Sequence, residues 1–194
     1  MREILFRAKT SSEICGFNTL KDGTWVHGFY RDKVGLPVIS QFEIDRGGDY
    51  IDYEIDEKTL CQFTGLVDKN GKKIFEGDIV EVWVERNIQG RKQSNQDTLV
   101  KARAVVDYGE TFCNIAYYLN YDNDYNKKIT QPKNKEYYDR DIQQRPIHCF
   151  TQQRIKENLE QNNQWWKGTN ERLKKMAEIE VIGNVWDNKE LLEG

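Results

Sequence analysis

The sequence predicts a mainly β protein whose strands are interrupted by a polar insertion carrying one or two α-helices. Short aromatic and aliphatic runs alternate with turn signals in the first third of the chain, which is typical of antiparallel strands. The pair Asn70-Gly71 and the β-prone run at 79–84 indicate paired strands in the middle. A segment rich in Asn, Gln and Lys at 120–145 then breaks the β pattern.

The N-terminal part, up to about residue 58, predicts three strands. They lie at EILFRA (3–8), TWVHGFY (24–30) and VISQFEI (38–44), separated by the turn KDG (21–23) and followed by the break RGGD (46–49). This spacing favours an antiparallel sheet.

The middle part, from about residue 59 to 119, predicts a meander. Asn70-Gly71 indicates a two-residue type I′ hairpin loop, in which both residues take positive φ. The next strand should present two faces, one with Val80, Val82 and Val84 and the other with Ile79, Glu81 and Trp83. Two further strands are expected at 100–108 and 112–119.

The run TGLVDKNGKKIFEGDIV (64–80) is a turn and not a phosphate-binding loop. A P-loop needs two glycines separated by four residues, then Lys and Ser or Thr before a helix. Here Gly65 and Gly71 are separated by five residues, Lys73 replaces the hydroxyl residue, and a strand follows. In the bend at 76–78, we expect Gly77 to supply the unusual torsions.

Asp78 in the same bend is expected to accept hydrogen bonds from backbone N–H groups.

The segment at 120–145 is expected to be a long polar excursion or a partly disordered loop. A helical pattern follows, with Gly168 as its stop and a second short helix from Thr169. On the first helix, one face should carry Ile155, Leu159, Asn162 and Trp166. The second helix should bury Leu173 and Met176. A final strand is expected from residue 179.

The sequence predicts no metal site. Asp122, Asp124 and Asn126 match the first three ligands of an EF-hand loop, but Lys127 and Lys133 occupy the positions of its glycine and its bidentate glutamate. For zinc, the two histidines and the nearest cysteine lack convergent spacing, since His148 adjoins Cys149 and His27 lies far away.

The sequence also indicates no catalytic residue and no cofactor. A nucleophile requires a base and an orienting group, and neither histidine lies in a recognisable catalytic motif. Among 32 carboxylates some pair will be close by chance, so no pair can be singled out.

Composition and charge favour a cytoplasmic protein. The 194 residues carry 29 Lys and Arg against 32 Asp and Glu, a net charge of −3 and no basic excess. No apolar run approaches the ~20 residues that span a bilayer, and the N-terminus lacks a signal-peptide pattern. The dispersed cysteines are expected to be reduced and buried: Cys15, Cys61, Cys113 and Cys149.

Several strings together resemble the YopX family, which occurs in phages and in prophage regions of bacterial genomes. The main one is YEIDEKTLCQFTGLVDKNGKKIFEGDIVEV (53–82). MREILFRA (1–8), DGTWVHGFY (22–30) and IEVIGNVWDNKELL (179–192) fall where that family has similar segments. The resemblance leaves two stretches uncovered, 86–97 and about 120–177.

The resemblance implies two β subdomains, the C-terminal one similar to an SH3-type barrel. The first would span 1–58 and the second 59–194, with the polar segment and its helices inserted at about 120–177. The family brings no catalytic residues to carry over. A small barrel hosts many unrelated functions, so the fold alone implies none.

Three function classes follow. The first is a non-catalytic interaction protein. It would form a homo-oligomer or bind a host or phage protein, with Trp165 and Trp166 as candidate contacts. The second is a nucleic-acid-binding barrel that uses Lys72 and Lys73, with Tyr137 and Tyr138 for stacking. The third, a metal-dependent enzyme, has no motif in its favour.

Overall fold

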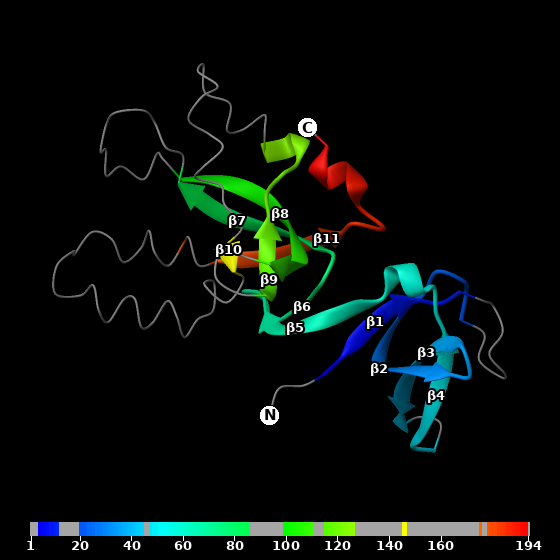
Figure 1. Ribbon diagram of the computed structural model, residues 1–194. Helices are drawn as coiled ribbons and strands as arrows, with labels where there is room; N and C mark the ends of the chain where they lie inside the picture. The colour runs from blue at the N-terminus through cyan, green and yellow to red at the C-terminus, as the bar shows by residue number, and fades with distance from the viewer. Residues whose placement is uncertain are drawn as a thin grey trace, which may run out of the picture. The chain divides into compact units, whose positions relative to one another are not determined.

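Antiparallel strands make up most of the described chain in the computed structural model, which confirms the mainly β prediction (Figure 1). The structure describes residues 4–11, 20–44, 47–85, 99–110, 115–126, 145–146, 175 and 178–193. The chain divides into two compact units, Met1–Gly65 and Leu66–Gly194, called unit 1 and unit 2 below.

In unit 1, the strands follow the order β4-β3-β2-β1-β5 within one sheet. The short helical turn η2 (Glu57–Thr59) precedes β5, which continues into unit 2. The strand bounds are β1 Phe6–Lys9, β2 Trp25–Lys33, β3 Leu36–Glu43, β4 Asp49–Glu54 and β5 Cys61–Val67. The first three correspond to predicted strands, whereas β4 had not been predicted.

The core of unit 1 lies on one face of this sheet. It consists of buried side chains from neighbouring strands and the residues that follow β4: Ala8, Val26, Ile39, Tyr53 and Ile55. Cys61 is also buried, as expected, and its thiol donates a hydrogen bond to the carbonyl of Thr59. The other three cysteines lie outside the described residues.

The β2–β3 hairpin turns through Val34 and Gly35, both with positive φ (57° and 82°). This is the backbone pattern of a two-residue type I′ loop. Asp32 supports it, because its Oδ1 accepts a hydrogen bond from the N–H of Gly35 at 2.7 Å. A β-branched residue in this region is strained, and Val34 is fully exposed at the tip.

Unit 2 holds a five-stranded sheet in the order β10-β9-β8-β7-β11, together with β6 and the short turn η5. Its bounds are β6 Lys73–Phe75, β7 Asp78–Glu85, β8 Leu99–Glu110, β9 Ile115–Asn120, β10 Arg145–Pro146, β11 Ile179–Asn184 and η5 Lys189–Leu192.

The turn after β5 differs from the prediction. Asn70 does not have positive φ, so the two-residue type I′ loop is wrong, although Gly71 does (φ 83°). The loop has three residues, since Asp68 and Lys72 pair through Asp68 N–H and Lys72 C=O at 2.8 Å. The cause is the Asp68 carboxylate, whose Oδ1 accepts from the N–H groups of Asn70 and Lys72 at 2.8 and 2.9 Å.

The bend before β7 agrees with the prediction. Gly77 has φ 74°. The buried Asp78 accepts a hydrogen bond from the N–H of Phe75 at 2.8 Å. A Cβ on Gly77 would lie 2.3 Å from the ring of Trp186, so only glycine fits there.

Val80 and Val82 lie on one face of β7, as predicted, and the structure places this face in the core of unit 2. These two register with Ala104 and Ala102 on β8. Ile79 on the other face is buried as well, while Glu81 and Trp83 remain partly exposed.

Residues 121–126 pack on β8 and are no loose polar excursion. Asn126 is buried and clamps the backbone of Arg103: its Oδ1 accepts from the Arg103 N–H at 3.0 Å and its Nδ2 donates to the Arg103 carbonyl at 2.5 Å. Asn123 donates to the same carbonyl at 2.9 Å. Polar side chains thus pair with the backbone here, which composition does not reveal.

The predicted insertion helices and most of the polar segment lie outside the described residues. In the part of the chain that is described, no helix is long and apolar enough to cross a membrane.

Candidate functional site

The face of the unit 1 sheet opposite the core carries the first candidate surface. Ile39 on β3 registers with Tyr53 on β4, and both belong to the core. Phe42 and Tyr50 also register with each other, three positions from the Ile39 and Tyr53 pair. Because side chains alternate between the faces of a strand, this second pair points away from the core.

Phe29, Phe42 and Tyr50 form a cluster on this face, called the aromatic patch below. The ring centroids of Phe42 and Tyr50 lie 5.2 Å apart and those of Phe29 and Tyr50 6.4 Å apart, with tilted planes. The three residues are 49%, 50% and 53% exposed. At ~150–250 Å² per aromatic residue, the patch leaves on the order of 300 Å² of ring surface exposed, comparable to the largest patch of many monomers.

Exposed apolar side chains are concentrated around this patch. Among the described residues, nine large hydrophobic side chains are exposed. Six of them lie between residues 29 and 50: Phe29, Val34, Leu36, Phe42, Ile44 and Tyr50. This concentration, rather than any single exposed residue, makes the region a candidate contact surface.

Charged residues border the patch, with basic side chains on β2 and an acidic side chain on β4. On β2, the guanidinium carbon of Arg31 lies 5.8 Å from the ring centroid of Tyr50, and Lys33 Nζ lies 3.1 Å from Asp52 Oδ2. Ser40 donates a hydrogen bond to Asp52 Oδ1 at 2.5 Å. That bond, followed by the nearby Lys33, holds the pKa of Asp52 below its ordinary value despite partial burial.

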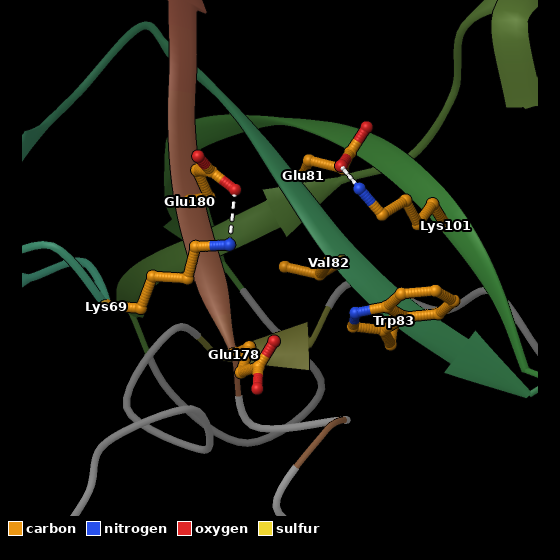
Figure 2. Close-up of a pocket in the computed structure, with 7 residues that line it drawn as sticks. All are labelled: Lys69, Glu81, Val82, Trp83, Lys101, Glu178 and Glu180. Carbon is orange, nitrogen blue, oxygen red and sulfur yellow. Dashed lines mark hydrogen bonds and ion pairs between the residues drawn. The ribbon is translucent and has the colours of Figure 1, made fainter.

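The second candidate surface is a pocket in unit 2 of about 170 Å³ (Figure 2). It is lined by side chains from β7, β8 and β11 and their neighbours: Lys69, Glu81, Val82, Trp83, Lys101, Glu178 and Glu180. In Figure 2, Lys69 reaches Glu180 and Lys101 reaches Glu81, while the Trp83 ring lies beside them.

Ion pairs satisfy most of the charge in this pocket. Lys69 Nζ lies 2.5 Å from Glu180 Oε2, and this hydrogen bond raises the pKa of Lys69 and lowers that of Glu180. Lysines also cover the tryptophan, since Lys175 Nζ and Lys101 Nζ lie 4.5 and 5.6 Å from the Trp83 ring centroid. The chain's own lysines therefore occupy the places that a cationic ligand would take.

The residues selected from the sequence fall in different places. Lys72 is exposed in the turn before β6, where its backbone bonds to Asp68, and Lys73 begins β6 and is partly buried. The other four candidates, Trp165, Trp166, Tyr137 and Tyr138, lie outside the described residues.

Neither surface gathers a set of metal-binding side chains among the described residues. Among the residues that the structure describes, no three His, Cys, Asp or Glu side chains gather where they could hold a metal ion. His27 is exposed on β2, where it registers with Arg7. What the patch offers chemically is apolar area, cation–π contact and charge.

The aromatic patch was not found from the sequence. Its members come from three strands, one of which had not been predicted, and their proximity depends on register. The alternation of Phe42 and the exposed Ile44 on the side opposite Ile39 is a signal that could have indicated it.

Comparison with known proteins agrees with the resemblance. The family model described as YopX protein matches residues 26–142, more than half of the chain. The chain therefore belongs to the YopX family. No curated protein and no solved structure shows significant similarity to it.

Proposed function

We propose that this YopX-family chain acts without catalysis, as a protein-interaction or self-assembling module, and that the aromatic patch is its contact surface. The observation that carries the proposal is the exposure of three adjoining rings at about half of their area each. Protein contacts are enriched in such aromatic residues, which supply large area at low entropic cost.

The proposal extends to origin and compartment. We propose a source in a phage or an integrated prophage, which the family resemblance supports, and a cytoplasmic location, which the composition of the sequence supports. Within this picture unit 2 is the scaffold and unit 1 presents the contact surface.

An SH3-type barrel for unit 2 is part of the same proposal. Its support is a set of bonds that tie the turns of unit 2 to distant strands. Gly77 N–H donates to the Val106 carbonyl at 2.8 Å, and Lys69 N–H donates to the Ile179 carbonyl at 2.9 Å. Such ties hold the ends of a curved sheet near one another.

A cross-linking experiment tests the interaction function. The tagged chain is cross-linked in the bacterial cytoplasm, and the wild type is compared with Phe42→Ser and with Tyr108→Ser. Tyr108 is the matched control, because it is 54% exposed but lies in unit 2. We expect cross-linked protein complexes, of one chain or several, that Phe42→Ser removes and Tyr108→Ser retains. The proposal would be overturned if the complexes persisted in Phe42→Ser, or if the wild type formed no cross-linked complexes.

Nucleic-acid binding is the alternative, which the described residues favour less. Lys69 and Lys101 are engaged by Glu180 and Glu81, and Lys72 and Lys73 lie on the same small hairpin. The absorbance ratio at 260 and 280 nm of the purified chain tests it, since bound nucleic acid would raise the ratio and salt would remove it.

A further inference from the structure

Opposite charges occupy opposite sides of the sheet face that bears the aromatic patch. Arg31 on β2 registers with Val38 on β3, and Val38 registers with Glu54 on β4. Arg31 and Glu54 thus stand at the same level on the two outer strands of this three-stranded region. Lys33 follows Arg31 on the same face of β2, and Asp52 precedes Glu54 on the same face of β4.

We infer that a second copy of this chain binds the aromatic patch face to face, about a two-fold axis that runs along β3 between the two sheets. This inference rests on the proposed function and names its partner. Such an axis places β2 of one copy over β4 of the other, and β3 over β3. Two sheets that pack face to face keep their strands within about 30° of each other.

This arrangement is self-complementary. Arg31 of each copy faces Glu54 of the second copy, so the same attraction occurs twice. Phe42 faces Phe42 of the second copy near the axis. Phe29 and Asp52 both register with Ser40, so Phe29 faces Asp52 of the second copy. The rings of Phe42 and Tyr50 supply the apolar part of the contact at one end of the strands, and Arg31 and Glu54 form a charged rim toward the other end.

Two other occupants fit less well. Single-stranded nucleic acid stacks on open ring faces beside a basic surface, but here the rings tilt against one another at 55° and 57°. Residues 1–65 also carry eight Lys and Arg against eleven Asp and Glu.

The second alternative is that two copies pair edge to edge through β4, and it agrees less well with the charges of that strand. β4 is the end strand of its sheet, but it carries Asp49, Asp52 and Glu54. Acidic residues on an end strand oppose pairing with another acidic strand.

Charge reversal at the rim tests the inference, with dissociation constants measured by sedimentation on the purified full chain. Arg31→Glu alone and Glu54→Arg alone each create two repulsive contacts and should weaken self-association by roughly 10- to 100-fold. The double variant restores both contacts and should return to within about threefold of the wild type. An equimolar mixture of the two single variants should do the same as a heterodimer, because each of its two contacts is then attractive.

Restoration in the mixture and in the double variant confirms the axis. Single variants that associate like the wild type, or a mixture that stays dissociated, overturn it. If Glu54→Arg does not fold, Leu36→Cys replaces it, because Leu36 is exposed on β3 on the same face as Phe42 and its substitution leaves the three rings of the aromatic patch in place. A short bismaleimide should then join two Leu36→Cys chains efficiently, with the wild type and Tyr108→Cys as controls, and failure to join them overturns the inference.

The outcome for the inference is separable from the outcome for the proposed function. A purified wild type that remains at its chain mass of 23.0 kDa overturns the second copy as partner. Cross-linked complexes that contain another protein and still depend on Phe42 would leave the interaction function standing.

Discussion

The two units of the chain use their side chains in different ways. Unit 1 exposes a cluster of aromatic rings on the sheet face opposite its core, and the buried side chains that bond to its backbone include hydroxyls, such as those of Thr10 and Thr59. In unit 2 the buried side chains that bond to the backbone are carboxylates and amides. Asp68, Asp78 and Asn126 are all buried in unit 2, and each bonds to backbone groups. The difference between the units therefore lies mainly in the exposed aromatic cluster of unit 1, and we propose that this unit carries the contact surface.

The largest expected effect comes from the core of unit 2. Leu119 is fully buried in that core, so Leu119→Ala should lower the free energy of unfolding by about 2–5 kcal/mol. Leu36 in unit 1 is 53% exposed, and Leu36→Ala is the matched control with an expected loss below about 0.5 kcal/mol. Urea unfolding followed by tryptophan fluorescence measures both, and equal losses would contradict the assigned core.

Next in size is the bend before β7. Gly77→Ala combines positive φ with a Cβ 2.3 Å from the Trp186 ring. We expect a loss of about 3 kcal/mol, because the backbone strain alone is worth ~1–2 kcal/mol and the ring must also move.

Gly71→Ala provides the control for this substitution. Gly71 also has positive φ, but a Cβ there meets nothing within 4 Å. Its loss should be limited to the ~1 kcal/mol of strain. If thermal denaturation gave equal losses for the two glycines, the contact with Trp186 would be refuted.

A smaller effect is expected at Asp68, which joins the turn after β5 to β11. Its Oδ2 accepts a hydrogen bond from the N–H of Val181 at 3.1 Å, and its Oδ1 accepts from Asn70 and Lys72. Asp68→Asn weakens these charge-assisted bonds and should cost about 2 kcal/mol. Asp122→Asn is the control, since Asp122 is exposed in the same unit.

The same residue gives a pH dependence. Burial opposes ionisation of Asp68, but the hydrogen bonds from Val181, Lys72 and Asn70 outweigh it and hold its pKa below 3.8. A lowered pKa stabilises the folded state at pH values above 3.8, and this contribution is lost as the pH falls through the lowered pKa. Between pH 7 and pH 2, wild-type stability should therefore fall more than that of Asp68→Asn. Parallel pH profiles would contradict the assignment.

The smallest effect on stability is expected at the aromatic patch. Phe42 is half exposed, so Phe42→Ser should change the free energy of unfolding by less than about 1 kcal/mol. Far-UV circular dichroism and urea unfolding on dilute protein measure it. A loss as large as that of Leu119→Ala would show that Phe42 belongs to a core and would end its role as a contact residue.

Local chemistry explains which parts of unit 2 could be predicted. Gly77 and Asp78 form their bend from neighbouring residues, so the sequence indicates it directly. The type I′ prediction at Asn70-Gly71 failed because Asp68, two residues earlier, captures the N–H groups of the loop and selects a longer turn. Asn126 escaped prediction because its partner, the backbone of Arg103, lies 23 residues away.

In unit 1, β4 was missed because its sequence DYIDYE mixes acids with aromatics and follows a glycine break. The aromatic patch needs β4 and the registers of β2, β3 and β4 together. A surface made by three strands has no continuous signature in the sequence, so the candidate residues chosen there were different ones.

Hydroxyl-radical footprinting over a range of protein concentrations tests most directly whether the contact surface lies in unit 1 and not in unit 2. Tyr50 and Tyr108 are nearly equally exposed in the single chain, at 53% and 54%. As the concentration rises, oxidation of Phe29, Phe42 and Tyr50 should decrease while that of Tyr108 stays constant. Oxidation of the aromatic patch that stays constant at every concentration, or protection of Tyr108 instead, would contradict the account.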